Sequence, residues 1–321
     1  MRKCRIVLFF GMGHQFHRAV AYATARVMRE NAEFNVIHVN VDLTLEAIRT
    51  RVLEFVYAPD SVDVFVPIGL RCSVYLKQVL QELALHKTVI FAGVRDPVSF
   101  GLVDSYAHPG ANATAVTCDP GENTAMAQRI VLMKDYISKV ILPYETFRDG
   151  DYIHQQVSDT VAYFRMHNVP VEPIQVSKSV DIVPLLKERV RKGDAVLLLE
   201  SAVGNIHEQV AYLCWEREAI LCADGFEAIE TGAVCALGID LYEIARGLAT
   251  VLKFFWFDKR PMGSIPVVCI PNKRVFVLNI AMLRAIGLPD EAAAHFRAGD
   301  GVLIIKKWVN CPTPIGGFSG A

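Results

Sequence analysis

Short, almost entirely apolar runs alternate along this chain with longer amphipathic segments. Strands buried on both faces of a parallel sheet have such continuous apolar runs, and helices that cover a sheet have apolar positions at helical spacing. The pattern predicts strands at 3–10, 34–40, 63–68, 89–94, 113–117, 139–142, 171–176, 195–199, 219–223, 267–270 and 275–279. It predicts helices at 16–30, 45–55, 73–85, 124–134, 152–167, 182–191, 204–217, 242–257, 280–286 and 290–296. A strand–helix alternation with right-handed crossovers predicts an α/β fold with parallel sheets and helices on both faces.

The strand–helix series runs twice, which predicts two Rossmann-like lobes. We expect crossings between the lobes near 113–117 and 233–238. Lobe 1 would comprise residues 1–115 and 236–272, lobe 2 residues 116–235 and 273–309, and residues 310–321 a loose tail. Several strands joining two lobes predict a hinge, and a cleft between lobes is where a small ligand binds.

One stretch, from Val89 to Val116, organises the expected first lobe. Its opening run predicts a buried strand that ends at Arg95-Asp96-Pro97, because proline cannot donate to a sheet ladder and holds the preceding residue extended. A charged pair is therefore expected at the carboxyl end of a central strand, where α/β sheets bind ligands. Asp96 is expected either to contact a ligand or to cap the turn at Pro97.

Short motifs in this stretch and further along the chain resemble those of a family of ABC transporter substrate-binding proteins, whose known members take up aromatic amino acids and similar small solutes. They are D-P-V at 96–98, G-L-V at 101–103, P-G-A-N-A-T at 109–114, D-G at 224–225, T-G-A at 231–233 and L-G-I-D-L-Y-E at 237–243. The resemblance covers most of the chain. It implies a type I periplasmic binding protein-like fold, a small-molecule ligand, a membrane permease as partner, and a place in the periplasm or on the outer face of the cytoplasmic membrane.

Composition agrees with an α/β protein and excludes several other classes. The chain has 321 residues, 52% of them hydrophobic, and a net charge of −1. Its mean hydropathy is +0.30. The charge balance predicts no attraction to nucleic acid or to an anionic membrane, and no apolar run approaches the ~18 residues of a membrane-spanning helix.

The cysteines and the N-terminus both bear on the compartment. None of the eight cysteines forms a C-x-x-C pair, so we expect no zinc site, and their scattered apolar positions favour a reducing compartment. The apolar run Ile6 to Phe10 is too short for the core of a signal peptide and is interpreted as the first strand. A cytoplasmic location therefore stays open beside export.

Fourteen residues in the loops after strands are candidates for ligand contact. They are Gly13, His14, Gly69, Leu70, Arg71, Ser73, Arg95, Asp96, Tyr144, Glu145, Glu200, Ser201, Asp224 and Glu227. The resemblance implies that the loop at 69–73 binds a ligand carboxylate through backbone amides and a hydroxyl at the start of a helix. Family members often carry Thr-Pro there, where this chain has Leu70-Arg71. Arg71 either adds a bidentate carboxylate contact or points into solvent.

The second lobe is expected to supply acids for an ammonium group. Family members commonly show Thr-Asp-Asn where this chain has Glu200-Ser201-Ala202, so either Glu200 takes the role of the family acid from a shifted position or the ligand differs. Asp224 matches the family's acidic loop, and Glu227 lies within reach of that loop. Asp224 either binds a ligand ammonium group or forms a salt bridge between lobes.

Three functions remain open from the sequence. The first is the capture of a small molecule, an amino acid or a similar solute, between two closing lobes for an ABC importer. This needs no catalytic residue, metal or cofactor, and the chain contains no P-loop, nucleophile elbow or H-E-x-x-H motif. The second is a cytoplasmic ligand sensor with the same fold. The third is an α/β enzyme that uses Gly11-Met12-Gly13 as a phosphate loop.

Overall fold

A computed structural model shows two compact units, each built from non-contiguous segments. Unit 1 contains residues 1–121 and 240–272, and unit 2 contains residues 122–239 and 273–321. The structure describes residues 3–11, 15–29, 33–60, 62–118, 123–145, 152–178, 181–199, 206–224, 227–239, 241–270, 274–294 and 302–305.

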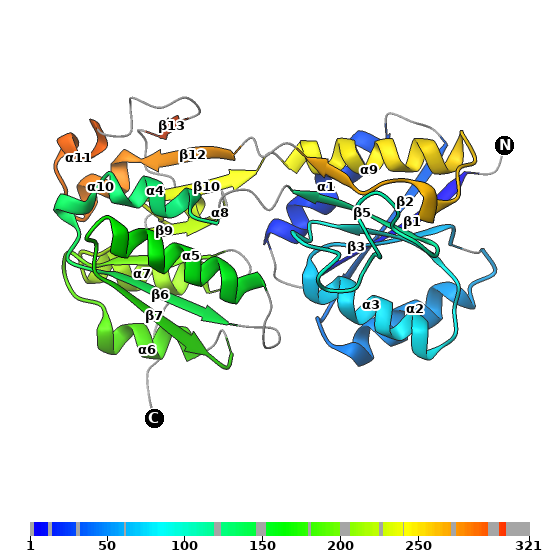
Figure 1. Cartoon of the computed structure of the whole chain (residues 1–321), viewed down its shortest axis with the longest axis horizontal. Helices are drawn as coiled ribbons and strands as arrows, with labels where there is room; N and C mark the ends of the chain where they lie inside the picture. The colour runs from blue at the N-terminus through cyan, green and yellow to red at the C-terminus, as the bar shows by residue number, and fades with distance from the viewer. Residues whose placement is uncertain are drawn as a thin grey trace. The chain divides into compact units, whose positions relative to one another are not determined.

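Unit 1 is a six-stranded parallel sheet covered by helices (Figure 1). In spatial order its strands are β11 (Val268–Ile270), β5 (Ala113–Cys118), β4 (Thr88–Ala92), β3 (Val64–Pro67), β1 (Cys4–Gly11) and β2 (Phe34–Val41). Its helices are α1 (Gln15–Arg29), α2 (Leu45–Val56), α3 (Leu70–Glu82), α9 (Leu241–Trp256) and the 3-10 turn η4 (Met262–Ser264). Helix α1 packs on α9, and α2 packs on α3 across the sheet from them.

Unit 2 repeats the design with seven strands. Their order is β13 (Val302–Ile305), β12 (Arg274–Asn279), β10 (Cys235–Ile239), β9 (Ile220–Asp224), β8 (Ala195–Leu198), β6 (Val140–Glu145) and β7 (Val171–Val176). Its helices are α4 (Ala125–Val131), η1 (Lys134–Tyr136), α5 (Tyr152–Met166), α6 (Ile182–Arg189), α7 (His207–Glu216), α8 (Glu227–Glu230), α10 (Ile280–Ala285) and α11 (Asp290–Ala294). Helix α4 packs on α5, and α6 packs on α7.

The predicted fold class is confirmed: both units are α/β with the strand order 2-1-3-4-5 at their centre. The sheet of unit 2 is not wholly parallel, since β12 runs antiparallel to β10. Among the described elements, four were not expected: the four-residue strand β13, the four-residue helix α8, and the three-residue turns η1 and η4. Segments this short carry too few periodic positions to stand out from a loop.

Pairing within the sheets places the two unit boundaries a few residues from the expected crossings. Strand β5 continues to Cys118 beside β4 and β11, so 116–118 lie in unit 1 rather than in the second lobe. Strand β10 pairs with β9 and β12, so 236–239 lie in unit 2. A crossing segment and the last strand of a sheet have the same apolar composition, and only the pairing distinguishes them.

The apolar character of the central strands follows from burial on both faces. Seven of the eight residues of β1 are buried, since α1 and α9 cover one face and α2 and α3 the other. The rings of Phe9 and Phe65, on neighbouring strands, lie 5.6 Å apart. Each buried side chain of this size contributes about 2 kcal/mol or more to folding, so this central layer holds unit 1 together.

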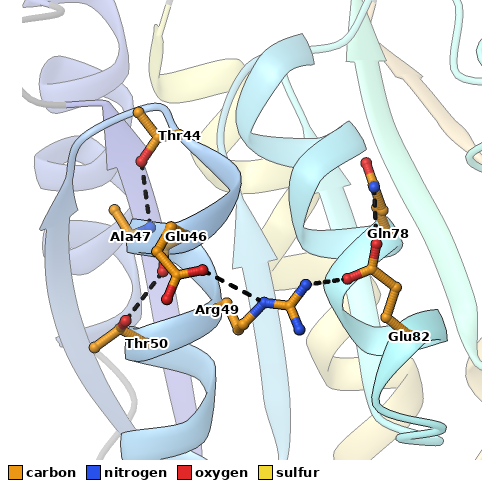
Figure 2. Close-up of polar contacts among 7 residues, drawn as sticks. All are labelled: Thr44, Glu46, Ala47, Arg49, Thr50, Gln78 and Glu82. Carbon is orange, nitrogen blue, oxygen red and sulfur yellow. Dashed lines mark hydrogen bonds and ion pairs between the residues drawn. The ribbon is translucent and has the colours of Figure 1, made fainter.

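Polar contacts join α2 and α3 on the outer surface of unit 1 (Figure 2). Thr44 caps α2 by accepting a hydrogen bond from the N–H of Ala47 at 3.2 Å. Arg49 of α2 pairs with Glu82 of α3, which also accepts a hydrogen bond from Gln78 at 2.8 Å. This network fixes the register of the two helices that lead into and out of β3.

Candidate functional site

The carboxyl ends of the parallel strands identify one edge of each sheet as the candidate site. In a sheet of order 2-1-3-4-5 the chain direction of the crossovers reverses between strands 1 and 3, and ligands bind outside the carboxyl ends at that point. In unit 1 this point lies between β1 and β3, and in unit 2 between β6 and β8. The expected loop at 69–73 follows β3, and residues 144–145 are the last two of β6, so both lie at these two points.

The start of α3 lies at this edge of unit 1. Gly69 caps the helix with φ 84° and ψ 163°, a conformation that favours glycine. The first helical hydrogen bond runs from Ser73 N to Gly69 O at 3.1 Å, so the helical hydrogen-bond ladder begins at Ser73. The 13-residue helix adds the positive end of its dipole.

Side chains of the same loop are positioned differently from one another. Ser73 is fully buried and its hydroxyl donates to Gly69 O at 2.8 Å, so its proton is used within the helix. Leu70 and Arg71 are half-buried on the first turn. Within this loop, the backbone amides and the Arg71 guanidinium are therefore the groups best suited to meet a carboxylate.

The Arg95–Asp96 pair lies beside this loop, because the ends of β3 and β4 are joined directly. Gly69 N donates to Ala92 O at 2.8 Å, which brings the start of α3 next to the end of β4. Asp96 Oδ1 accepts a hydrogen bond from Ser99 N at 3.1 Å, the turn-capping role that was one of its two expected duties. Arg95 is half-buried and its Nη1 atom is shielded from solvent. This edge of unit 1 thus carries two arginines on adjacent loops.

The P-G-A-N-A-T motif builds the frame that holds this loop. Thr114 Oγ1 donates to Ile265 O at 2.8 Å, and Gly110 N donates to Gly263 O at 3.2 Å. A Cβ atom on Gly263 would lie 2.1 Å from Ala111 O, so the two turns approach backbone to backbone. Thr117 Oγ1 donates to Arg95 O at 2.9 Å, which links β5 to the charged turn. The motif therefore acts on the candidate site by positioning it.

In unit 2 the described candidates lie at the ends of two strands separated by β8. Tyr144 and Glu145 end β6, and both are half-buried; the Tyr144 ring contacts His154 edge-on at 6.1 Å between centroids. Asp224 ends β9, and Glu227 begins α8 three positions further along the chain. These acidic residues therefore belong to the carboxyl edge of this sheet, whereas the corresponding edge of the sheet in unit 1 has Arg71 and Arg95. Four candidates, Gly13, His14, Glu200 and Ser201, lie outside the described residues.

His207 belongs to this edge of unit 2 and was not among the expected residues. It is the first residue of α7, the helix that follows β8, and buried Ala211 and Cys214 continue its face of the helix. Its Nε2 atom is buried and has no hydrogen-bond partner. Burial lowers the pKa of His207 to about 4, so the ring is neutral at pH 7. A histidine in the first turn of the helix expected at 204–217, after a buried strand, was the available signal in the sequence.

Within the described ranges, no group of three or more His, Cys, Asp or Glu side chains could hold a metal ion. No helix in the same ranges is long and apolar enough to cross a bilayer.

Comparison with known proteins gives one family and several structural relatives. A family model described as ABC transporter substrate binding protein matches residues 49–291. A tyrosine-binding protein of Clostridioides difficile is 23% identical over 210 residues, which are 65% of this chain and 59% of that protein. The chain thus spans about three fifths of the length of this curated relative.

Two solved structures share the fold at low identity. An ABC domain in complex with L-Trp from Streptococcus pneumoniae superposes with a TM-score of 0.76 at 17% identity, covering 94% of this chain and all of that one. A ligand-free, open substrate-binding protein with adhesive properties from Clostridium difficile gives a TM-score of 0.63 at 14% identity, covering 95% and 100% of the two chains.

Proposed function

This chain belongs to the ABC transporter substrate-binding protein family, and on that premise we propose that it captures a zwitterionic small molecule, an amino acid or a close analogue, for a membrane permease. Proteins of this family bind substrates and are typically not enzymes. The ligand contacts the carboxyl edges of both units, which close around it. The work is done outside the cytoplasmic membrane, where the family usually acts.

The observation that carries this proposal is the start of α3. In this proposal, the positive end of the helix dipole, the backbone amides of the first turn, and the arginines at 71 and 95 receive a carboxylate beside the switch point of unit 1. A carboxylate bound here exchanges its water shell for fixed donors that are already oriented.

The opposite charge on unit 2 supports a ligand with two charged ends. Glu145, Asp224 and Glu227 lie at the carboxyl edge of its sheet. An ammonium group placed among them would be paired, as a buried charge requires. The neutral His207 ring adds a polar atom at the same edge that does not repel a cation. The tyrosine-binding relative and the structural relative in complex with L-Trp make amino acids the first ligands to try.

The test is a calorimetric panel of free amino acids, their methyl esters and the matching decarboxylated amines. We expect at least one free amino acid to bind and its ester and amine to bind at least tenfold more weakly, a loss of about 1.4 kcal/mol or more. Purines, sugars, thiamine-like pyrimidines and nucleotides complete the panel. Stabilisation by nucleotides alone would refute the proposal and favour an enzyme.

Two variants divide the recognition between the units. Arg71→Ala should lower the affinity for the free amino acid at least tenfold. It should leave the weaker affinity for the methyl ester unchanged, because the ester lacks the negative charge that pairs with Arg71. Asp224→Ala should weaken all ligands that carry an ammonium group at least tenfold. Arg51→Ala and Asp135→Ala, on exposed surface of units 1 and 2, are the matched controls and should bind like the wild type. Unchanged affinity in Asp224→Ala would remove Asp224 from the site.

A further inference from the structure

A pair of buried cysteines joins two neighbouring strands in the core of unit 2. Cys222 of β9 and Cys235 of β10 are directly opposite in the parallel ladder. Both are fully buried, and the Cys235 thiol donates to Cys222 Sγ with a sulfur–sulfur distance of 3.1 Å. Cys214 of α7, also buried, lies close enough to influence the ionisation of Cys222.

The ladder places the two thiols within reach of a covalent bond. Residues directly opposite on adjacent strands carry their side chains on the same face, and their Cα atoms are separated by roughly 4.8 Å, inside the ~4.4–6.8 Å range of disulfides. A disulfide has a sulfur–sulfur distance of about 2.05 Å, so the two sulfur atoms need to approach by only about 1 Å.

We propose that Cys222 and Cys235 form a disulfide when the chain folds in the presence of a disulfide oxidant, such as oxidised glutathione or a thiol–disulfide oxidoreductase. One thiolate attacks the oxidant and forms a mixed disulfide, releasing one oxidant thiol. The second thiolate attacks the protein sulfur of that mixed disulfide and releases the other. In total the protein loses two protons and two electrons, and one disulfide of the oxidant is reduced to two thiols.

Burial determines when this reaction is possible. Neither sulfur is accessible to an oxidant in the folded unit. The neighbouring Cys235 thiol, together with burial, holds the pKa of the Cys222 thiol well above its ordinary value, so little thiolate exists to react. The bond therefore forms before β9 and β10 close into the sheet. The redox state of the pair is therefore set by the compartment in which the chain folds, oxidising or reducing. Exposure of the folded protein to an oxidant does not change it.

The sequence allows a direct readout by mass spectrometry. Trypsin releases residues 218–246 as one peptide that contains both Cys222 and Cys235, whereas Cys214 lies in the preceding peptide, 193–217. After refolding with a mixture of oxidised and reduced glutathione and alkylation in denaturant, we expect the peptide 218–246 to carry no alkyl group and to be lighter by two hydrogens. Cleavage after Glu227 or Glu230 should leave its halves linked until they are reduced.

Two comparisons make the test decisive. Natively folded, reduced protein treated with the same oxidant should keep both cysteines alkylatable after denaturation. Cys214→Ala should still form the link, and Cys222→Ala should lose it. Full alkylation of the peptide 218–246 after oxidative refolding of the wild type, or a link between Cys214 and Cys222 in its place, would overturn the proposal. Rapid oxidation of the natively folded protein would overturn the order of events.

Discussion

The role of a single residue in this protein depends on how deeply its side chain is buried and on which partners lie beside it. Asp96 is one example: its carboxylate, at the end of a strand, accepts a hydrogen bond from the N–H of Ser99 and so caps its own turn. Ser73 is another, since its buried hydroxyl donates back to Gly69. His207 is the opposite case, a buried ring whose Nε2 has no partner. Such an atom costs stability unless a ligand satisfies it.

His207 should make stability depend on pH. Its pKa is about 4 in the folded protein against an ordinary 6.5, so unfolding takes up a proton between these values. Stability is therefore complete above pH 6.5 and is lost as the pH falls toward 4, by about 2 kcal/mol between pH 8 and pH 5. Urea denaturation at both pH values measures this loss.

His207→Gln is the matched variant, because glutamine keeps a polar side chain but does not titrate. Its free energy of unfolding should fall less than that of the wild type over the same pH range, by about the amount assigned to His207. His38, whose pKa is also lowered by burial and by Arg29, contributes equally to both proteins and cancels. Identical pH dependence in the two proteins would show that His207 is not the group responsible.

At the scale of elements, close packing and short polar links set the geometry of the candidate site. Gly247 brings α9 against β5, where a Cβ atom would lie 2.8 Å from Val116 Cγ1. Gly69 N ties the start of α3 to the end of β4. The position of the arginines at 71 and 95 relative to one another therefore depends on these backbone links and less on their own side chains.

The pairing of α2 with α3 through Arg49 and Glu82 should contribute modestly to stability. Both side chains are about one-third exposed, so water weakens their attraction. We expect Arg49→Ala to lower the free energy of unfolding by up to about 1 kcal/mol, and 0.5 M salt to reduce this difference.

Arg51→Ala provides the comparison for this helix pair. Arg51 pairs with Glu54 inside α2 and is about half exposed, so its removal should cost less than that of Arg49. Urea denaturation of the two variants at low and high salt measures both effects. Equal losses in the two variants would mean that the link between helices adds nothing beyond a surface ion pair.

At the scale of the whole molecule, the two units have the same central strand order and each presents the carboxyl ends of its strands as a site. Arg71 and Arg95 belong to unit 1, and Glu145, Asp224 and Glu227 belong to unit 2. If the ligand contacts both units, as proposed, its addition should slow amide hydrogen exchange at 70–72 in unit 1 and at 224–230 in unit 2. The amino ends of the strands, at 62–64 and 219–220, serve as internal controls and should not change. Protection confined to one unit would contradict capture by both.

The sequence alone determined the two α/β units and nearly every strand and helix, because buried parallel strands are continuous apolar runs and covering helices have periodic ones. It also placed the candidate loops after the strands, since glycine, proline and charged residues end an apolar run. Burial and pairing were decided only by the tertiary structure. Backbone geometry determines that Ser73 and Asp96 form hydrogen bonds within their own turns. Atoms distant in sequence determine that His207 Nε2 has no hydrogen-bond partner and that Cys222 contacts Cys235. The hydrophobic pattern of a sequence indicates which residues are buried. Only the three-dimensional structure determines which groups those residues contact.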